Sequence, residues 1–597
     1  MTGGRPCAVC MYYTRRERCH WPTLKEEFFK GMCQRVLVLV AFDVDALCAC
    51  KILQYLFQCD HILYTIVPVS GREDFERAFV AHSEGIRHVI LVNCGATDDI
   101  IEMLQPEDNI TFFVCDSHRP VDVHNIYNQV QVKLLMRPDE LHDVPQFDEV
   151  FSDDDEEPEE ADDVCEEPEE ADDDSGNDSD TSGPVRKKKR VDEQTLEKER
   201  EKRLWREARN KRIFEYTEFS GFGTSAALLM FEIAWKMSKD TNDLLWLAIL
   251  GVTSQYANRQ VERDKYIEDI GQLQSHVSRL NNRSEDDSEN IISVNCLKIT
   301  FESELQLTMY RHWSLFESLC HSDYTFCKFK MWSMKGKKRL HEFLADMGLP
   351  LVQCRQRFAA MDMSLKETVK DMISKQTEKY SIDEQKLFLP SFHVQFGFKN
   401  KFCAMDAVLA CEAMLESVSA NLTPSDNFLK AGDVLNRSKT ECMEKALSQA
   451  KMQLQAIVHQ VQTFIDMKHQ VICAGPFLYA FVTEGTPDAS FFSKPTCLCH
   501  LAQFTLDAYS TMSHNKRAQN LPLVLGAPQD ADLGTMLVVG VPPASDTSRK
   551  NFFGKAFEQA AITSNTQMMQ DNFDSNVIML KMDDKSKFFD ALISLLQ

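Results

Sequence analysis

Two acidic motifs in the first 120 residues carry the side chains best suited to chemistry. Asp43 and Asp45 are two residues apart, and Asp116 is followed two residues later by His118. Carboxylates and an imidazole are the groups that hold divalent ions such as Mn²⁺. Two such ions about 3.5–4 Å apart can activate water and stabilise in-line displacement at phosphorus. These residue types therefore point to metal-assisted phosphoester hydrolysis as the chemistry to test.

The surrounding patterns predict a parallel sheet that would bring these motifs together. Residues 35–42 are continuously apolar and rich in valine, as expected of a strand buried on both faces. Strand patterns alternate with helical ones after it: strands at 62–69, 88–93, 111–115 and 130–135, and helices at 46–57 and 72–82. Asp43, Asn93 and Asp116 lie at predicted strand ends, where reactive groups of such sheets gather.

The order of these motifs resembles that of the DHH phosphoesterase superfamily, which includes the RecJ-type single-strand exonucleases. The resemblance implies a second-motif Asp, a His-His pair and a fourth acid after a helix. This chain has Asn93, Ser117 and Ser254 at those positions. Because metal binding depends steeply on the number of ligands, we expect no metal and no catalytic residue. We interpret Asp43, Asp45, Asn93, Asp116, Ser117, His118 and Ser254 as a vestigial pocket whose acids stabilise loops and cap helices.

Four longer strings are more specific and resemble the family of cell division control protein 45, in its animal form. They are DVDALCACKIL at 43–53, DSHRP at 116–120, HEFLADMGLP at 341–350 and RKNFFGKAFE at 549–558. The similarity runs from about residue 26 to the C-terminus. It implies an α/β fold: a RecJ-like DHH parallel-sheet domain, an all-helical insertion and a C-terminal DHHA1-like α/β domain.

That resemblance also implies a function without catalysis or cofactor. The family consists of nuclear replication factors that join the MCM ring and the GINS complex at chromatin to form the replicative helicase. The helical insertion is the part implied to dock on MCM and GINS, and single-stranded DNA is implied to lie between the two α/β parts. The chain contains no credible ATP-binding motif, which agrees with ATP hydrolysis by the MCM ring.

Composition adds a charged segment to this picture. The chain has 597 residues and a formal net charge of −25. Eighteen of its acidic residues lie within 153–180. Without them the net charge is −7, which does not argue against local contact with nucleic acid. Self-repulsion and the lack of apolar residues predict a disordered loop there. We expect no membrane contact, because no apolar run approaches the roughly 20 residues needed to span a bilayer.

Short signals flank this acidic loop. Arg186, Lys187, Lys188, Lys189 and Arg190 form a compact basic run, for which nuclear import competes with nucleic-acid binding; its setting favours import and a nuclear location. Ser152 and Ser175 each precede an Asp by three residues, which suits an acidophilic kinase.

The remaining sequence predicts the domain limits. Residues 1–23 are expected to be a mobile extension, 24–150 the DHH domain and 151–190 the acidic loop. A charged helix at 193–212 and helices at 225–239 and 243–257 complete the DHH domain over 191–259. Residues 260–385 have few strand patterns and predict the helical insertion, with a capping box at 364–367; 386–597 return to mixed α/β.

Five basic residues are candidates for binding single-stranded DNA because they lie near aromatic residues: Lys399, Lys401, Arg549, Lys550 and Lys555. An equally good interpretation is that the neighbouring phenylalanines, Phe552, Phe553 and Phe557, belong to the core. Two rival functions also fit the sequence: a working metal-dependent exonuclease or phosphoesterase, and an acidic chaperone-like protein that acts through residues 153–180.

Overall fold

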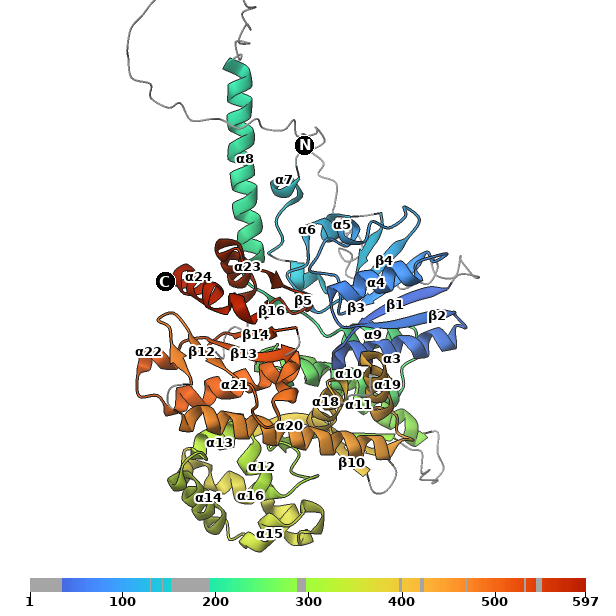
Figure 1. Ribbon diagram of the computed structural model, residues 1–597. Helices are drawn as coiled ribbons and strands as arrows, with labels where there is room; N and C mark the ends of the chain where they lie inside the picture. Colours follow the sequence, from blue (N-terminus) through green and yellow to red (C-terminus); the bar gives the residue numbers. More distant parts are fainter. Residues whose placement is uncertain are drawn as a thin grey trace, which may run out of the picture. The chain divides into compact units, whose positions relative to one another are not determined.

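The protein is described by a computed structural model (Figure 1) that covers residues 35–128, 130–141, 143–151, 193–286, 297–396, 400–418, 423–467, 470–530, 533–543 and 550–597. It contains two compact units. One comprises the described residues up to 141 and from 218 onward, and the other comprises those between 143 and 217. The predicted N-terminal extension, the import run, Ser152, Ser175, Lys399 and Arg549 lie outside the described residues.

A five-stranded parallel sheet forms the N-terminal part, as predicted. Its strands are β1 (Val36–Ala41), β2 (Tyr64–Val69), β3 (His88–Val92), β4 (Thr111–Cys115) and β6 (Val132–Leu134), in the order β2-β1-β3-β4-β6. Every residue of β1 is buried, with at most 3% of its surface exposed. Burial on both faces explains the unbroken apolar run, because neither side of the strand meets water.

Helices and short elements complete this sheet. They are α3 (Val44–Cys59), α4 (Arg72–His82), α5 (Ile100–Leu104), β5 (His118–Arg119), α6 (Val123–Tyr127), η1 (Pro138–Leu141), β7 (Gly221–Phe222), α9 (Ala226–Lys236) and α10 (Asn242–Ala257). The α9 and α10 helices pack on α3 and on each other, and most of their residues are buried. Ser225 is the N-cap of α9, and its side chain accepts a hydrogen bond from the Leu228 backbone N–H.

The middle of the chain is mostly helical. It comprises α11 (Arg263–Asp286), β8 (Leu297–Leu305), α12 (Leu315–His321), α13 (Asp323–Phe329), α14 (Met334–Asp346), α15 (Leu351–Arg355), η2 (Phe358–Ala360), α16 (Met363–Tyr380) and α17 (Glu384–Leu387). The prediction missed the strand β8. It pairs along its whole length with β9 (Phe388–Phe396), and its exposed and half-buried polar residues hide the alternation in sequence.

The predicted capping box at 364–367 is wrong. The α16 helix begins at Met363, and Asp362 is its N-cap, so Ser364 already lies in the first turn. The α14 helix ends at Asp346, and Gly348 follows with a φ of +73°. Glycine suits that left-handed position because it has no Cβ.

The C-terminal part is mixed α/β, as predicted. Its elements are β10 (Asn400–Cys403), α18 (Ala404–Leu415), α19 (Pro424–Val434), α20 (Thr440–Asp466), β11 (Ile472–Cys473), β12 (Leu478–Phe481), η3 (Ala489–Ser493), α21 (Pro495–Met512), α22 (Lys516–Gln519), β13 (Leu523–Asp530), β14 (Thr535–Val541), α23 (Phe553–Ser564), β15 (Met568–Met569), β16 (Val577–Lys581), η4 (Met582–Asp584) and α24 (Lys585–Leu596). Six strands form one sheet in the order β11-β12-β13-β14-β16-β15, with only β12 and β13 parallel.

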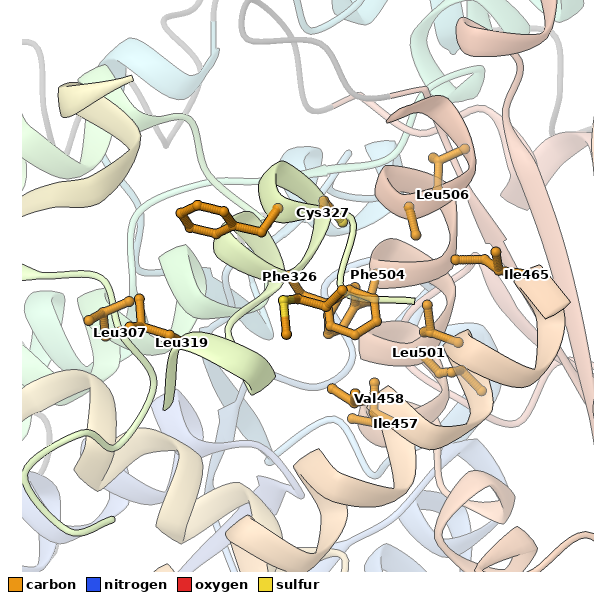
Figure 2. Close-up of a cluster of buried hydrophobic side chains, with 14 of the residues drawn as sticks. Leu307, Leu319, Phe326, Cys327, Ile457, Val458, Ile465, Leu501, Phe504 and Leu506 are labelled. Atoms are coloured by element: carbon orange, nitrogen blue, oxygen red, sulfur yellow. The ribbon is translucent and has the colours of Figure 1, made fainter. Parts of the chain in front are cut away.

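One hydrophobic core joins the helical stretch to the C-terminal part (Figure 2). Phe326 of α13 meets Phe504 of α21 edge to face, with ring centroids 5.2 Å apart. Leu319 and Cys327 belong to the same cluster as Ile457 and Leu501. The helical stretch is therefore fixed to the C-terminal sheet by burial, while the predicted domain limits stay a prediction.

The described residues of the unit at 143–217 form α7 (Phe147–Val150) and the long helix α8 (Glu193–Thr217). The α8 helix extends five residues beyond the predicted end at residue 212. Arg212 of α8 lies 3.5 Å from Glu149 of α7. Within the described chain, no helix combines the length and apolar character that a membrane span needs.

Candidate functional site

The predicted pocket residues meet at the carboxyl edge of the parallel sheet. Asp43 follows β1 and is the N-cap of α3, accepting a hydrogen bond from the Ala46 backbone N–H at 2.7 Å. Asn93 follows β3, and Asp116 follows β4. Adjacent parallel strands end side by side, which is why Asn93 has neighbours 50 and 24 positions away in the chain.

Asn93 lies at the centre of this group. Its Nδ2 donates to Oδ1 of Asp43 at 3.1 Å and to Oδ2 of Asp45 at 3.2 Å. Its Oδ1 accepts from the backbone N–H of Ser117 at 3.1 Å. A backbone N–H can only donate, so this bond fixes the orientation of the amide and turns its N–H donors toward the two acids.

Asp45 is buried and holds the start of α9. Its two oxygens accept from Ser225 Oγ at 2.5 Å, from Ala226 N at 2.8 Å and from Ala227 N at 3.0 Å. The first turn of a helix has unpaired N–H groups and a partial positive charge, so a carboxylate there is well stabilised. Together with Asn93, these contacts give Asp45 four donors from the protein itself.

Gly251 lets α10 pass close to this carboxylate. A Cβ at this position would lie 2.5 Å from Oδ1 of Asp45 and 2.6 Å from the Cβ of Ala227. Ser254, one turn later on α10, is buried with 3% of its surface exposed. The helix that carries Ser254 thus packs against the pocket through Gly251.

Asp116 and His118 form a second group with a residue from the C-terminal part. Oδ1 of Asp116 lies 2.6 Å from Nδ1 of His118, and Asp574 Oδ1 lies 3.3 Å from Nε2 of the same ring. Burial would raise the pKa of Asp116, but the charge and hydrogen bonds of His118 outweigh it and lower the pKa. Burial would lower the pKa of His118, but Asp116 and then Asp574 hold it well above its usual range.

The pKa of the Asp43 carboxyl is shifted in the opposite direction from that of Asp116. Burial, followed by the charge of Asp45, raises its pKa from 3.8 to about 7, although Ala46, His118 and Asn93 act in the other direction. A substantial fraction of Asp43 therefore carries a proton at neutral pH.

The C-terminal part reaches this edge of the sheet at a second place. Gly71 is the N-cap residue of α4 and has no side chain that could accept hydrogen bonds from the first turn of the helix. Asp571 accepts these hydrogen bonds instead. The Arg72 backbone N–H donates to Asp571 O at 2.7 Å, and the Glu73 N–H donates to Asp571 Oδ1 at 2.9 Å. Asp571 therefore caps a helix that lies 498 positions earlier in the chain.

Sequence reasoning missed Asp571, Asp574 and Gly251, because nothing local marks residues that act on partners this far away. Ser225 carried a usable signal, since a serine before an apolar helical run is typical of an N-cap.

The candidate DNA-binding residues in the described chain are partly engaged. Lys401 Nζ lies 3.1 Å from Glu302 Oε1, and Lys555 Nζ lies 2.7 Å from Glu558 Oε2. Lys550 is exposed. Phe553 and Phe557 are fully buried, which confirms the core interpretation for these two rings.

Two other side-chain groups have ligand atoms close enough for a metal ion. Among the described residues, these are Asp99 with Asp122 and His124, and Glu302 with Glu304 and His393. In the second group Glu304 already contacts Arg311 at 2.8 Å and Lys370 at 3.3 Å, so its negative charge is matched by protein cations.

The family model CDC45 matches residues 36–595. The chain belongs to the CDC45 family. It is 46% identical over 577 residues to the human cell division control protein 45 homolog, covering 96% of this chain and 99% of that one. It is 30% identical to the Schizosaccharomyces pombe homolog, covering 95% and 97%.

Structure comparison agrees with this assignment. The crystal structure of CDC45 from Entamoeba histolytica aligns over 96% of this chain and 99% of its own, with a TM-score of 0.67 and 22% identity. The fold class predicted from the family resemblance is therefore confirmed. As a CDC45 family member the chain is a DNA replication and cell-cycle protein, as that resemblance implied.

Proposed function

We propose that this protein is a non-catalytic subunit that assembles with the MCM ring and GINS into the replicative DNA helicase in the nucleus, at chromatin, and contacts single-stranded DNA. Membership of the CDC45 family supports the replication role. The arrangement at the carboxyl edge of the parallel sheet supports the absence of catalysis.

The observation that carries the proposal is the position of Asn93. In a two-ion phosphoesterase, oxygen ligands from several acids converge on cations. Here the amide of Asn93 directs N–H groups at Asp43 and Asp45 instead. Those N–H groups donate hydrogen bonds to both acids at the place where a cation would bind in such an enzyme.

The other surviving ligands are engaged as well. Asp45 accepts three donors from the start of α9, and the two nitrogens of His118 face Asp116 and Asp574. Binding two ions would require breaking these contacts and deprotonating Asp43. The residues present do not fit a two-ion centre, and the acids are better understood as loop and helix supports.

Docking on MCM and GINS is proposed for the helical stretch between β8 and β9. Its helices share a core with α20 and α21, which would give a partner-binding element a rigid base. Exposed apolar residues occur on it, namely Met334, Val352 and Met363.

The experiment is affinity purification of the tagged chain from replicating nuclei. Co-purification with MCM and GINS subunits in stoichiometric amounts is expected. A chain that lacks residues 153–180 should assemble equally well, which separates this proposal from an acidic chaperone. Loss of assembly on that deletion, or absence of both partners from the purified material, would overturn it.

A further inference from the structure

The helices α13 and α14 form a segment that is rich in cations and contains no acid. Between Asp323, which pairs with Arg259 at 2.7 Å, and Glu342, no aspartate or glutamate occurs. The same stretch contains six basic residues: Lys328, Lys330, Lys335, Lys337, Lys338 and Arg339. Exposed faces of globular proteins usually mix both signs of charge, so this run needs a separate explanation.

The end of α13 lies against the start of α14. Lys330 is the C-cap of α13, and a Cβ at Gly336 of α14 would collide with its carbonyl oxygen. Gly336 and Leu340 turn toward the core and are buried. The exposed residues here are defined as the basic patch: Lys330, Met334, Lys335, Lys337 and Lys338.

Met334 lies among the lysines of this patch. At 100° per residue it is about 40° from Lys338 and about 60° from Lys337 around the axis of α14. Its side chain is 81% exposed. The outer face of the first two turns therefore combines an apolar side chain with flanking cations.

The acids on the same side of α14 do not cancel this charge. Glu342 follows Lys338 by one turn, and its Oε1 lies 3.9 Å from the Lys338 Nζ. Asp346, one turn further on, is held by Lys379 of α16 at 2.5 Å. The other three lysines of the patch have no ion pair within the described chain. Four lysines less Glu342 leave a net charge of +3.

Glu317 of α12 and Arg355 of α15 lie near the Lys337 side of the patch. All three charges act on the pKa of the Cys320 thiol: burial raises this pKa most, Glu317 adds to the rise, and Lys337 and Arg355 oppose it. Because Glu317 and Arg355 carry opposite charges, they leave the excess of the lysines unchanged.

Helix stability does not account for the lysines of α14. Its first turn contains no acid, although acids are the residues that the positive end of the helix dipole favours. Lys335 lies in that turn and Lys337 and Lys338 follow directly, where cations are disfavoured. Their position is explained if a ligand supplies the negative charge.

We infer that the basic patch binds an acidic peptide segment of a partner protein, with an apolar side chain of that segment on Met334. Methionine is flexible and adapts to such contacts. Nucleic acid fits less well, because a phosphate backbone has no apolar group for Met334 and single strands need a ring for stacking. Phe326 and Phe329 are buried, and Trp332 is half-buried with its ring 5.7 Å from that of Phe326. This inference rests on the proposed docking of the helical stretch and names the chemistry of the partner segment.

The test titrates the full chain with two labelled synthetic peptides, one of glutamate with interspersed leucine and one of glutamate alone. In the double variant Lys335→Gln with Lys338→Gln, affinity for both peptides should fall about fivefold at low salt, because exposed ion pairs are lost. Met334→Gln should weaken only the leucine-containing peptide, by about threefold. Melting temperatures should not fall, because glutamine and lysine have similar helix propensities.

The matched control is the double variant Lys430→Gln with Lys445→Gln, which removes the same charge from exposed positions on α19 and α20. It should leave both affinities unchanged. Equal losses in the two doubles would assign the effect to net charge and overturn the inference, and so would no loss in either. Tighter binding of an oligothymidine that the Lys335 and Lys338 double weakens would assign the patch to nucleic acid and also overturn it.

Each titration is repeated in a chain without residues 153–180, because that acidic segment competes for any cationic face. A loss specific to the Lys335 and Lys338 double that appears only after this deletion supports the inference, and absence of the loss there contradicts it. Co-purification of the parent chain with MCM and GINS tests the proposed function separately, so the two can fail independently.

Discussion

The backbone N–H of Ser117 donates to Oδ1 of Asn93 at 3.1 Å, and this bond turns the amide nitrogen of Asn93 toward Asp43 and Asp45. Ser117 and Asn93 stand where the phosphoesterase pattern implies metal ligands. Here they bond to each other, and the Asn93 amide donates hydrogen bonds to the two acids. On the function proposed above, these hydrogen bonds occupy oxygens that a phosphoesterase would offer to cations.

Replacing the Asn93 amide by a carboxylate should make the folded chain more stable when a cation binds beside the acids. Asn93→Asp removes both N–H donors and adds a third acid, so the free energy of unfolding should fall by about 2–4 kcal/mol at neutral pH. Mn²⁺ should raise the melting temperature of this variant and leave that of the parent unchanged. Asn210→Asp on exposed α8 is the control. Equal Mn²⁺ stabilisation of parent and variant would refute the argument.

The close approach of α10 to Asp45 predicts a steric effect. In Gly251→Ala the new Cβ would meet Asp45 Oδ1 at 2.5 Å, so the variant should lose about 1–3 kcal/mol in urea unfolding. Gly271→Ala in α11 meets nothing within 4 Å and should gain about 0.5–1 kcal/mol from helix propensity. The account fails here if both glycine variants are stabilised alike.

The proton on Asp43 predicts a pH dependence of stability. Its pKa is raised from 3.8 to about 7 in the folded chain, so the folded state binds more protons in this interval. The resulting stabilisation is complete below pH 3.8 and is lost as the pH rises through about 7. Asp43→Asn cannot titrate, so its stability should fall less than that of the parent between these limits. Urea midpoints at a series of pH values measure the difference, and parallel curves would show that Asp43 titrates normally.

Capping of α4 by Asp571 predicts that a larger residue at position 71 will loosen the start of this helix. Gly71 has an extended φ of −174°, so alanine fits its backbone, but the Cβ would lie 2.5 Å from Asp571 O and Oδ2. In Gly71→Ala the amides of Arg72 and Glu73 should exchange hydrogen faster, because their acceptors are displaced. Gly221→Ala, where a Cβ meets nothing within 4 Å, should exchange like the parent. Unchanged exchange in both variants would mean that Asp571 does not cap α4.

The sequence allowed the parallel sheet and the pocket residues to be predicted because both depend on local patterns. The apolar run of β1 and the acids directly after it are adjacent in the chain, and parallel strands bring their ends together. The resemblance of the four strings to the family then implied an α/β fold for the C-terminal part. Long-range partners could not be predicted this way. Asp574 meets His118 across 456 positions, and no periodicity encodes that contact.

The strand β8 was missed for a different reason. Leu297 and Ile299 are buried, but Lys298, Glu302 and Glu304 interrupt the apolar pattern, and Glu304 is buried only because Arg311, Lys370 and His393 surround it. A charged residue in a strand pattern indicates an exposed position unless its ion-pair partners are known. Tertiary charge pairing therefore overrode the local signal.

The central claim is that Asn93 and its neighbours have replaced metal chemistry, and nuclease activity tests it most directly. Purified chain is incubated with Mn²⁺ and end-labelled single-stranded DNA, beside an Asp43→Ala variant of the same preparation. We predict no digestion above the protein-free blank in either sample. Robust Mn²⁺-dependent digestion by the parent that Asp43→Ala abolishes would contradict the claim.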